Sequence, residues 1–496
     1  MTYIMDYLDP QKQLREHIIL IVGYILVAVA ITMATMVLVY QAYGFGLAKN
    51  GTVIQNGLVF FSSQPNPASI YINGVLNANT TNTRLVLPSG VYNVKLTRPG
   101  YRDWQRTIVF DAGSVEHYDY PVLFPNTLKS DKIQTYNAAP GLETQSPDRR
   151  WLLIEQPGSM TNFSLRDLKN PATSTLSTLT LPDNLLTKAT GAESWQFDEW
   201  ADDNQHVLLS HLYDGKTEFI LVDRADPTQS INLNTTLNTN PTKLTLNNKK
   251  YDQYYIYNAN GAIETASLST GTTLTPFLQN VLAYQSYGNG TMLYVTNDGA
   301  PAGKVLLKIL SGGQTVTIRS LPVSSSYLLD LTQYNGLLYV AAGATSDSRV
   351  YIYQDPISQF SNQQGTIVPS QILRTLQPNY LSFSDNAQFI VAENGTSFAV
   401  YDIQNEKAYS YNTTPPLDAP QVHAGWMDGD RLVYVSGGKL IVFDYDGTNQ
   451  QTLMDASAAY LPAFSTNYRY AFSLDASTPP GKFDLDQTPL LLPSDL

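Results

Sequence analysis

The 496-residue sequence contains no cysteine. That absence excludes disulfides, thiolate metal sites and cysteine nucleophiles together. Charged residues are also scarce, at 15% of the chain, whereas soluble domains typically carry about 25%. In their place stand 33 tyrosines and many Asn, Thr, Ser and Gln residues, a composition that disfavours long surface helices. Since the hydrophobic fraction is an ordinary 43%, the sequence favours an all-β protein with a sizeable core.

Basic residues are the scarcer of the two charged kinds, with 30 Lys and Arg against 42 Asp and Glu and a net charge of −12. Residues 1–125 are close to neutral, so the acidic excess belongs to the rest of the chain. A protein that binds nucleic acid needs a basic footprint. The charge balance therefore argues against nucleic acid as a partner.

One long apolar run lies near the N-terminus. The 22 residues from Ile18 to Val39 include no charged side chain. As a helix they span about 33 Å, enough for a hydrocarbon core of about 30 Å. Residues 18–40 are therefore predicted to form a transmembrane helix. The alternative is a cleaved signal peptide, but the apolar region of such a peptide is usually only about 7–15 residues long, and the candidate motif Ala28-Val29-Ala30 lies inside the run.

The charges that flank this run predict its orientation. Lys12 and Arg15 precede it, and only Lys49 follows it closely. Because positive flanks stay in the cytoplasm, residues 1–17 are expected there and the bulk of the chain is expected outside. The prediction is a single-pass membrane protein with its bulk outside the cytoplasm, at the cell surface.

Residues 57–122 show the pattern of a small antiparallel β-sandwich. Asn73-Gly74 is a strong hairpin signal, since both residues tolerate positive φ. In Val91–Thr97, alternate residues share a face, as in a strand that is buried on one side. No helical pattern interrupts the region.

This region resembles the PEGA domain family. The matching stretches are Pro67–Gly74, Leu87–Val94 and Gly100-Tyr101. The family's Pro-Glu-Gly-Ala motif is present as Pro88-Ser89-Gly90-Val91, in which the turn-forming Pro and Gly are kept. The resemblance implies a prokaryotic, usually extracytoplasmic and non-catalytic module that is linked to surface layers and cell envelopes. It implies no active site.

A cluster of cations lies within the same region. Lys95, Arg98, Arg102 and Arg106 have only Asp103 between them as a counter-charge. Near a membrane anchor, such a patch is a candidate for contact with anionic headgroups or an anionic wall polymer. The alternative is an ordinary solvated strand face, which is what most short charge runs are.

A loose repeat recurs from about residue 130 to the end of the chain. Each unit has a polar turn, an apolar strand, a second turn and another strand that ends near Asp. The apolar strands begin near Trp151, Val207, Tyr254, Met292, Leu337, Phe389, Leu432 and Tyr470. Their spacing of 38 to 56 residues is close to the length of a four-stranded propeller blade, about 40–50 residues. Residues 130–496 are therefore predicted to form a seven- or eight-bladed β-propeller.

Three details of the repeat region add further expectations. Lys132–Tyr136 would supply the missing outer strand of the last unit and close the ring. Residues 225–248, rich in Asn and Thr, are expected to form a long polar loop between the second and third blades. Ser146-Pro147-Asp148 and the hairpin at Asp444–Asn449 resemble TolB-like propeller repeats.

No motif for a catalytic nucleophile, a phosphate-binding loop or a metal site is recognisable, so no catalytic, cofactor-binding or metal-ligating residue is predicted. His206 and His211 lie five positions apart on one expected strand, hence on opposite faces, and cannot share a metal ion. The acidic stretch Asp198–Asp203 allows a Ca²⁺ site in principle, but a solvated turn between blades explains it better because no ligand spacing is present.

The sequence supports two classes of function. The first is a membrane-anchored binding or scaffold protein, whose Tyr- and Asn-rich propeller surface contacts an envelope protein or glycan and needs no cofactor. The second is an enzyme that acts on envelope glycan or peptide, with carboxylates from several blades meeting at the central channel. Spacing in the sequence cannot reveal such a carboxylate pair.

Overall fold

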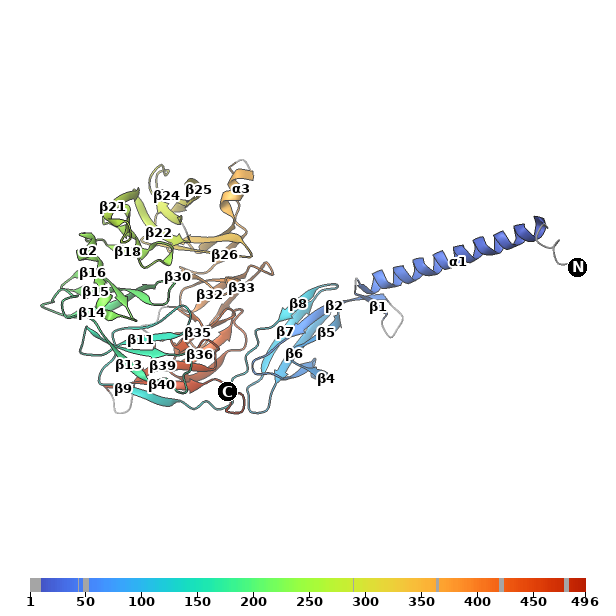
Figure 1. Ribbon diagram of the computed structural model, residues 1–496, viewed down its shortest axis with the longest axis horizontal. Helices are drawn as coiled ribbons and strands as arrows, with labels where there is room; N and C mark the ends of the chain where they lie inside the picture. The colour runs from blue at the N-terminus through green and yellow to red at the C-terminus, as the bar shows by residue number, and fades with distance from the viewer. Residues whose placement is uncertain are drawn as a thin grey trace, which may run out of the picture. The chain divides into compact units, whose positions relative to one another are not determined.

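The computed structural model describes residues 10–42, 44–47, 53–288, 290–362, 365–418, 423–476 and 481–496. The chain divides into two compact units, Met1–Asn126 and Thr127–Leu496 (Figure 1). Of the segment expected in the cytoplasm, residues 1–9 lie outside the described part, as does Lys49.

Helix α1 (Pro10–Ala42) opens the first unit. Proline suits the first turn of a helix, where its missing N–H is not needed. From Leu14 to Ala42 the helix is long and apolar enough to cross a membrane, and its side chains are not buried by the rest of the protein. The hydroxyls of Thr32 and Thr35 donate to the carbonyls of Ala28 and Ile31, at 2.8 Å each, so both are satisfied within the helix.

Two four-stranded sheets make up the rest of this unit. The strands are β1 (Phe45–Leu47), β2 (Val53–Phe61), β3 (Ser69–Ile72), β4 (Val75–Thr80), β5 (Thr83–Pro88), β6 (Gly90–Thr97), β7 (Trp104–Phe110) and β8 (Val115–Tyr118). One sheet has the order β1-β2-β5 with β8 also paired to β2, and the other has the order β4-β3-β6-β7. Buried Val59 and Leu85 from the first sheet and Val94, Leu96 and Ile108 from the second form the core.

The alternation predicted along Val91–Thr97 is confirmed, and one strand differs from the expected antiparallel pattern. Asn73 and Gly74 form the predicted turn, with φ of 49° and 80°. Strand β8, however, pairs with β2 in parallel. The chain turns back after β7 at residues 111–114 and then returns along β2 in the same direction.

Eight four-stranded antiparallel sheets form the second unit, a β-propeller (Figure 1). Blade 1 contains β10 (Glu143–Gln145), β11 (Trp151–Glu155), β12 (Asn162–Asp167) and β13 (Leu176–Thr180). Blade 2 contains β14 (Glu193–Trp200), β15 (His206–Tyr213), β16 (Lys216–Asp223) and β17 (Ile231–Asn232). Blade 3 contains β18 (Lys243–Leu246), β19 (Gln253–Tyr257), β20 (Ile263–Ser267) and β21 (Gly271–Leu278). Blade 4 contains β22 (Val281–Tyr287), β23 (Thr291–Thr296), β24 (Lys304–Ser311) and β25 (Gln314–Pro322).

The other four blades repeat this order, with the innermost strand first. Blade 5 contains β26 (Tyr327–Tyr334), β27 (Leu337–Ala344), β28 (Arg349–Gln354) and β29 (Gln371–Arg374), with helix α3 (Pro356–Asn362) between the last two. Blade 6 contains β30 (Tyr380–Phe383), β31 (Phe389–Glu393), β32 (Ser397–Asp402) and β33 (Lys407–Asn412). Blade 7 contains β34 (Gly425–Trp426), β35 (Arg431–Ser436), β36 (Lys439–Asp444) and β37 (Gln451–Asp455). Blade 8 contains β38 (Ala463–Phe464), β39 (Tyr470–Ala476), β40 (Phe483–Pro489) and β9 (Asp131–Tyr136).

Strand β9 settles the blade count at eight and closes the ring. It pairs with β40, so the first strand of the unit completes the last blade, as predicted from Lys132–Tyr136. The hydroxyl of Thr135 donates to Asp484 at 2.6 Å, and Lys132 forms an ion pair with the same carboxylate at 2.5 Å. The two ends of the second unit are therefore held together by backbone and side-chain bonds.

The expectation of a long polar loop over residues 225–248 is wrong. This stretch contains a 3-10 helix (Pro227–Gln229), β17, helix α2 (Leu233–Leu237), β18 and a second 3-10 helix (Asn247–Lys249). Leu233, Leu237, Leu244 and Leu246 are buried between blades 2 and 3. The composition of this stretch, rich in Asn and Thr, resembles that of a loop. Its four leucines nevertheless pack into the core and hold the stretch in regular structure.

Polar side chains tie neighbouring blades together around the ring. Asp330 Oδ2 accepts from the backbone N–H of Phe383 in the next blade at 3.0 Å, and Glu393 Oε1 accepts from Ala424 N–H at 2.8 Å. In the other direction, the Trp200 indole N–H donates to Thr144 Oγ1 at 2.9 Å. Apolar layers fill the space between the blades, so the core is distributed around the ring.

Candidate functional site

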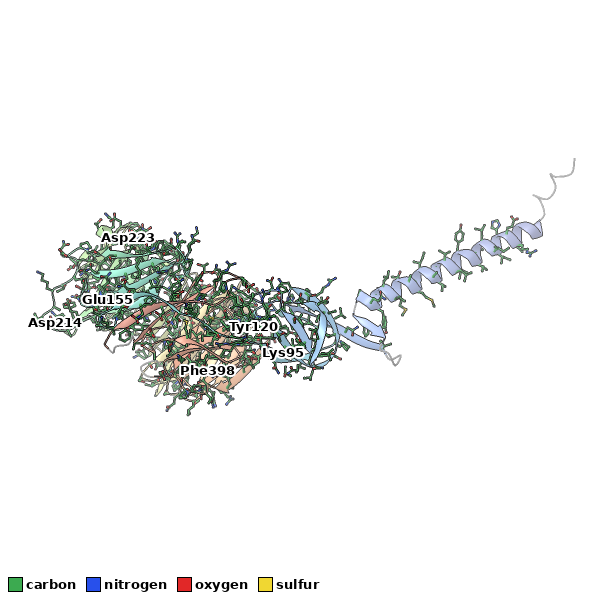
Figure 2. All side chains as sticks on the ribbon, turned by 90° about the horizontal axis from the view of Figure 1, so that it is seen from below. Lys95, Tyr120, Glu155, Asp214, Asp223 and Phe398 are labelled. Carbon is green, nitrogen blue, oxygen red and sulfur yellow. The ribbon has the colours of Figure 1, made fainter. Side chains whose placement is uncertain are left out.

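The structure does not bring the four predicted cations onto one face. Lys95 pairs across the strands with exposed Gln105, whereas Arg106 pairs with buried Val94 and so lies on the core side of the sheet. Lys95 forms an ion pair with Asp103 at 3.0 Å. Arg106 donates to the Tyr120 hydroxyl at 2.5 Å; Lys95 and Tyr120 are labelled in Figure 2.

Arg98 and Arg102 follow β6, at the end of the sheet opposite to β1 and α1. Arg98 donates to the Pro67 carbonyl at 2.7 Å, and burial lowers the pKa of Arg102. These two cations therefore lie far from the point where the helix joins the sheet. Envelope contact through this patch stays a prediction.

The acidic side chains of residues 198–203, before the second strand of blade 2, bond separate partners. Asp198 accepts from the Ser210 hydroxyl at 2.6 Å, and Asp203 accepts from the His206 ring at 2.6 Å. Glu199 bonds the backbone N–H of Leu246 and the Lys249 ammonium group. Among the described residues, no group of three or more His, Asp and Glu side chains is placed to hold a metal ion.

A cavity of about 580 Å³ lies where blades 1, 2 and 8 meet at their inner strands. Its lining includes residues 141–145 and 458–463, and residues 195–197 of the second blade. Phe197 lines it with 40% of its surface exposed, beside Gln196 and the largely buried Trp195. Aromatic faces and amide groups together suit a ligand that has both apolar and hydrogen-bonding surfaces.

A β-bulge helps to place Phe197 in this cavity. In the pairing of β14 with β15, Phe197 faces Leu209 and Glu199 faces Leu208, so Asp198 is the extra residue. A bulge bends its strand and redirects the neighbouring side chains. Burial raises the pKa of Asp198 to about 6, and the Ser210 hydroxyl opposes that shift.

Glu143 supplies a buried acid at the cavity. Both of its carboxylate oxygens are buried and have no hydrogen-bond partner among the described residues. Burial raises its pKa to about 8, so the side chain is mostly protonated at neutral pH. Glu155 on β11, labelled in Figure 2, lies against Gly141 and leaves no room for a side chain there. Burial also raises the pKa of Glu155, and the Gly141 N–H opposes that shift.

A second buried acid, Glu393, lies in blade 6. It accepts a hydrogen bond from Ala424, the residue after His423. His423 lines the cavity, and its ring stacks on Tyr380 with the centroids 3.9 Å apart. Burial raises the pKa of Glu393 to about 8, while the backbone N–H of Ala424 opposes the shift. Oε2 of Glu393 has no partner among the described residues.

The turns between the first and second strands of the blades lie at the end of the channel opposite to the cavity. Side chains from these turns contact one another across the channel. Arg149 from blade 1 forms an ion pair with Asp385 from blade 6. The Arg149 guanidinium also lies over the Tyr468 ring of blade 8, 4.8 Å from its centroid. Side chains from three blades thus meet at this end, and the cavity belongs to the other end.

Sequence reasoning did not find Glu143, Phe197 or the cavity. The only signal was a polar or charged residue within a short inner strand, and the inner strands of most other blades have such residues too. What distinguishes Glu143 is a neighbour more than 300 positions away, because residues of blade 8 enclose it after the ring closes. That information is absent from any local pattern.

Comparison with known proteins identifies one domain. Residues 56–122 match the PEGA domain family. No curated protein matches the chain. Among solved structures, Hsv2 from Kluyvelomyces marxianus is 11% identical, with 65% of this chain and 100% of that chain covered and a TM-score of 0.40. The Dos1 propeller is 12% identical, with 73% and 95% covered and a TM-score of 0.43. An oligogalacturonate lyase from Vibrio parahaemolyticus is 10% identical, with 74% and 100% covered and a TM-score of 0.35.

Proposed function

We propose that this protein is a membrane-anchored binding protein of a bacterial cell envelope. In this proposal α1 holds the chain in the membrane, with residues 1–17 in the cytoplasm and the PEGA domain and propeller outside. The propeller, built of TolB-like repeats, binds an envelope protein or glycan at its channel. The observation that carries the proposal is the apolar part of α1, 29 residues from Leu14 to Ala42 whose side chains the described protein does not cover.

The cavity between blades 1, 2 and 8 is the proposed binding site. It combines an exposed aromatic ring, two glutamine side chains and a protonated carboxyl group that has no hydrogen-bond partner among the residues that the structure describes. Phe197 would provide contact area for the ligand, and Gln196 beside it would provide hydrogen bonds. The far end of the channel is crossed by the Arg149–Asp385 pair, which directs a ligand to this end.

Membrane anchoring predicts the behaviour of the chain during alkaline carbonate extraction. The full-length protein is expected to stay with the membrane pellet. Replacing both Ile25 and Val29 by Arg is expected to release most of it, because each central arginine costs about 2.5–3.5 kcal/mol on insertion. The control is Gln41→Arg, which places one arginine at the helix end, where its charge reaches the interface. Release of the unmodified chain would contradict the anchor.

Ligand capture predicts a loss that is specific to the cavity. Immobilised full-length protein in detergent is expected to retain a component of the envelope fraction, and Phe197→Ala is expected to weaken capture about tenfold, since truncating a central aromatic contact costs more than about 1 kcal/mol. Leu376→Ala removes an apolar side chain that is 68% exposed elsewhere on the propeller and serves as the control. Equal capture by both variants would rule out the cavity as the binding site.

An enzyme that hydrolyses envelope glycan or peptide is the second candidate, and Glu143 is the observation that favours it. A carboxylic acid that keeps its proton near neutral pH is suited to act as a general acid. With an enzyme, Glu143→Gln would abolish hydrolysis of the captured component and leave capture intact. With a binding protein, neither the unmodified chain nor the variant would hydrolyse it.

A further inference from the structure

Five exposed valines lie on the outer surface of the PEGA domain. Each side chain is between 59% and 63% exposed, which is high for a purely apolar residue. The five valines come from several different strands. The five are Val53, Val86, Val91, Val109 and Val115, and they are called the valine rim here. Clustered exposed apolar side chains indicate a surface that contacts another apolar phase.

The strand register places the whole valine rim at one end of the domain. Val91 and Val109 pair with each other, one step from the last pair of β6 and β7. On the other sheet, Leu58 of β2 pairs with Val86 of β5 on one side and with Val115 of β8 on the other. Strands β5 and β7 run toward this end, and β2, β6 and β8 run away from it. The rim therefore occupies the outer faces of both sheets at the same end.

Helix α1 joins the domain at this end. The backbone N–H of Asn56 donates to the Gly44 carbonyl at 2.7 Å, and Gly44 N–H donates to Gln41 at the end of the helix at 3.0 Å. A cavity of about 390 Å³ is bounded by Gln41 and Ala42 of the helix together with Leu58, Val86 and Val115 of the sheet. Two members of the rim, Val86 and Val115, thus share a cavity with the end of the helix.

The chain length between helix and sheet fixes how far the rim can lie from a membrane. Two residues separate Ala42 from the first residue of β1. At no more than about 3.6 Å per residue, the sheet starts within about 11 Å of the helix end. A headgroup layer adds about 5–8 Å on each side of the hydrocarbon core. If the helix spans a bilayer, the end of the domain that carries the rim is held next to the headgroups.

The opposite end of the domain has a different character. Arg98, Arg102 and Tyr101 lie there, and none of the described large apolar side chains of that end is exposed. Val75 and Leu76, the other exposed apolar residues of the two sheets, sit on the β3–β4 hairpin and pair with Ile72 and Tyr71, which places them level with Val94 and Lys95 of β6. Of the seven exposed large apolar side chains on the described strands of the two sheets, five therefore lie at the end next to the helix.

We infer that the valine rim docks onto the lipid bilayer that holds α1, so that the PEGA domain rests in the headgroup layer. This inference rests on the proposed membrane anchor and adds a second, apolar contact with the lipid. Because the rim is made of valines, the contact needs no anionic lipid and little of it depends on salt. The partner is the lipid surface itself.

The absence of cysteine allows a direct test with single labels. Full-length Val91→Cys and Val115→Cys proteins, each carrying an environment-sensitive nitrobenzoxadiazole label, are placed in phosphatidylcholine nanodiscs with and without headgroup spin-labelled lipid. The matched control is Val323→Cys, because Val323 is 60% exposed on the propeller. The labels at positions 91 and 115 are expected to show blue-shifted emission that the spin-labelled lipid quenches, unchanged by added salt. The label at position 323 is expected to show aqueous emission without quenching.

Each other outcome overturns the inference in a recognisable way. Aqueous, unquenched emission at positions 91 and 115 in protein that is stably held in the discs rejects docking of the rim but keeps the anchor. Blue-shifted emission without quenching by lipid shows that protein, such as a second copy of the chain, covers the rim instead. Failure of the full-length chain to enter the discs rejects the anchor, and the inference with it.

Discussion

The free energy of unfolding of the full chain is expected to fall as the pH rises from 4.5 to about 8, because of Glu143 and Glu393. Burial raises the pKa of each carboxyl from 4.5 to about 8. In that interval the unfolded chain has lost both protons, whereas the folded chain still holds them. Since the unfolded state binds fewer protons, stability decreases with rising pH, with a slope of up to about 1.4 kcal/mol per pH unit for each group.

Denaturant unfolding followed by tryptophan fluorescence at a series of pH values measures this slope. Glu143→Gln and Glu393→Gln keep the size of the side chain and remove its titration, so each is expected to flatten the dependence and the double variant to flatten it most. Glu406→Gln changes an exposed carboxyl on the same propeller and serves as the control. A slope that is the same in all variants would contradict the burial of these two acids.

Phe472→Ala is expected to cost about 3–5 kcal/mol of unfolding free energy, the usual loss when a fully buried aromatic side chain is removed. Phe472 on β39 has no exposed surface. It packs in the cluster that joins Tyr136 of β9, Leu485 of β40 and Ile154 of blade 1. The substitution therefore weakens the place where the last blade, the first blade and the closing strand meet.

Leu376→Ala provides the comparison for this substitution, because its side chain is 68% exposed. Surface changes of this kind usually alter stability by less than about 0.5 kcal/mol. Limited proteolysis adds a second readout: the Phe472→Ala protein is expected to be cut first near β9 or in blade 8. Equal stability of the two variants would mean that closure of the ring does not depend on this cluster.

Repetition made the architecture predictable from the sequence. Each blade encodes its own apolar strands and turns, so a spacing of 38 to 56 residues was enough to predict a propeller. The closing strand was predictable for the same reason, since the last unit lacked one strand and Lys132–Tyr136 had the right pattern. In the PEGA domain, the Asn73-Gly74 turn and the alternation along β6 are local signals, and both are present in the structure.

Features that depend on distant partners were not predictable in this way. The four cations looked like one patch in the sequence, but the strand register places Lys95 and Arg106 on opposite faces. The shifted pKa of Glu143 depends on enclosure by blade 8, and the placement of Phe197 depends on a bulge whose register is set by β15. The valine rim could not be predicted because its members are scattered over more than 60 positions of the sequence. Only the register of five strands shows that they lie at the same end of the domain.

The central claim is that α1 is an uncleaved anchor with the PEGA domain and the propeller on the outer side of the membrane. Single cysteines at Thr2 and Leu376, introduced separately into the cysteine-free full-length chain, allow a direct measurement with a membrane-impermeant maleimide on intact cells. The account predicts that position 376 is labelled in intact cells, that position 2 is labelled only after permeabilisation, and that both labels are on full-length chain in the membrane fraction. Labelling of position 2 in intact cells with protection of position 376, or loss of position 2 by cleavage, would contradict it.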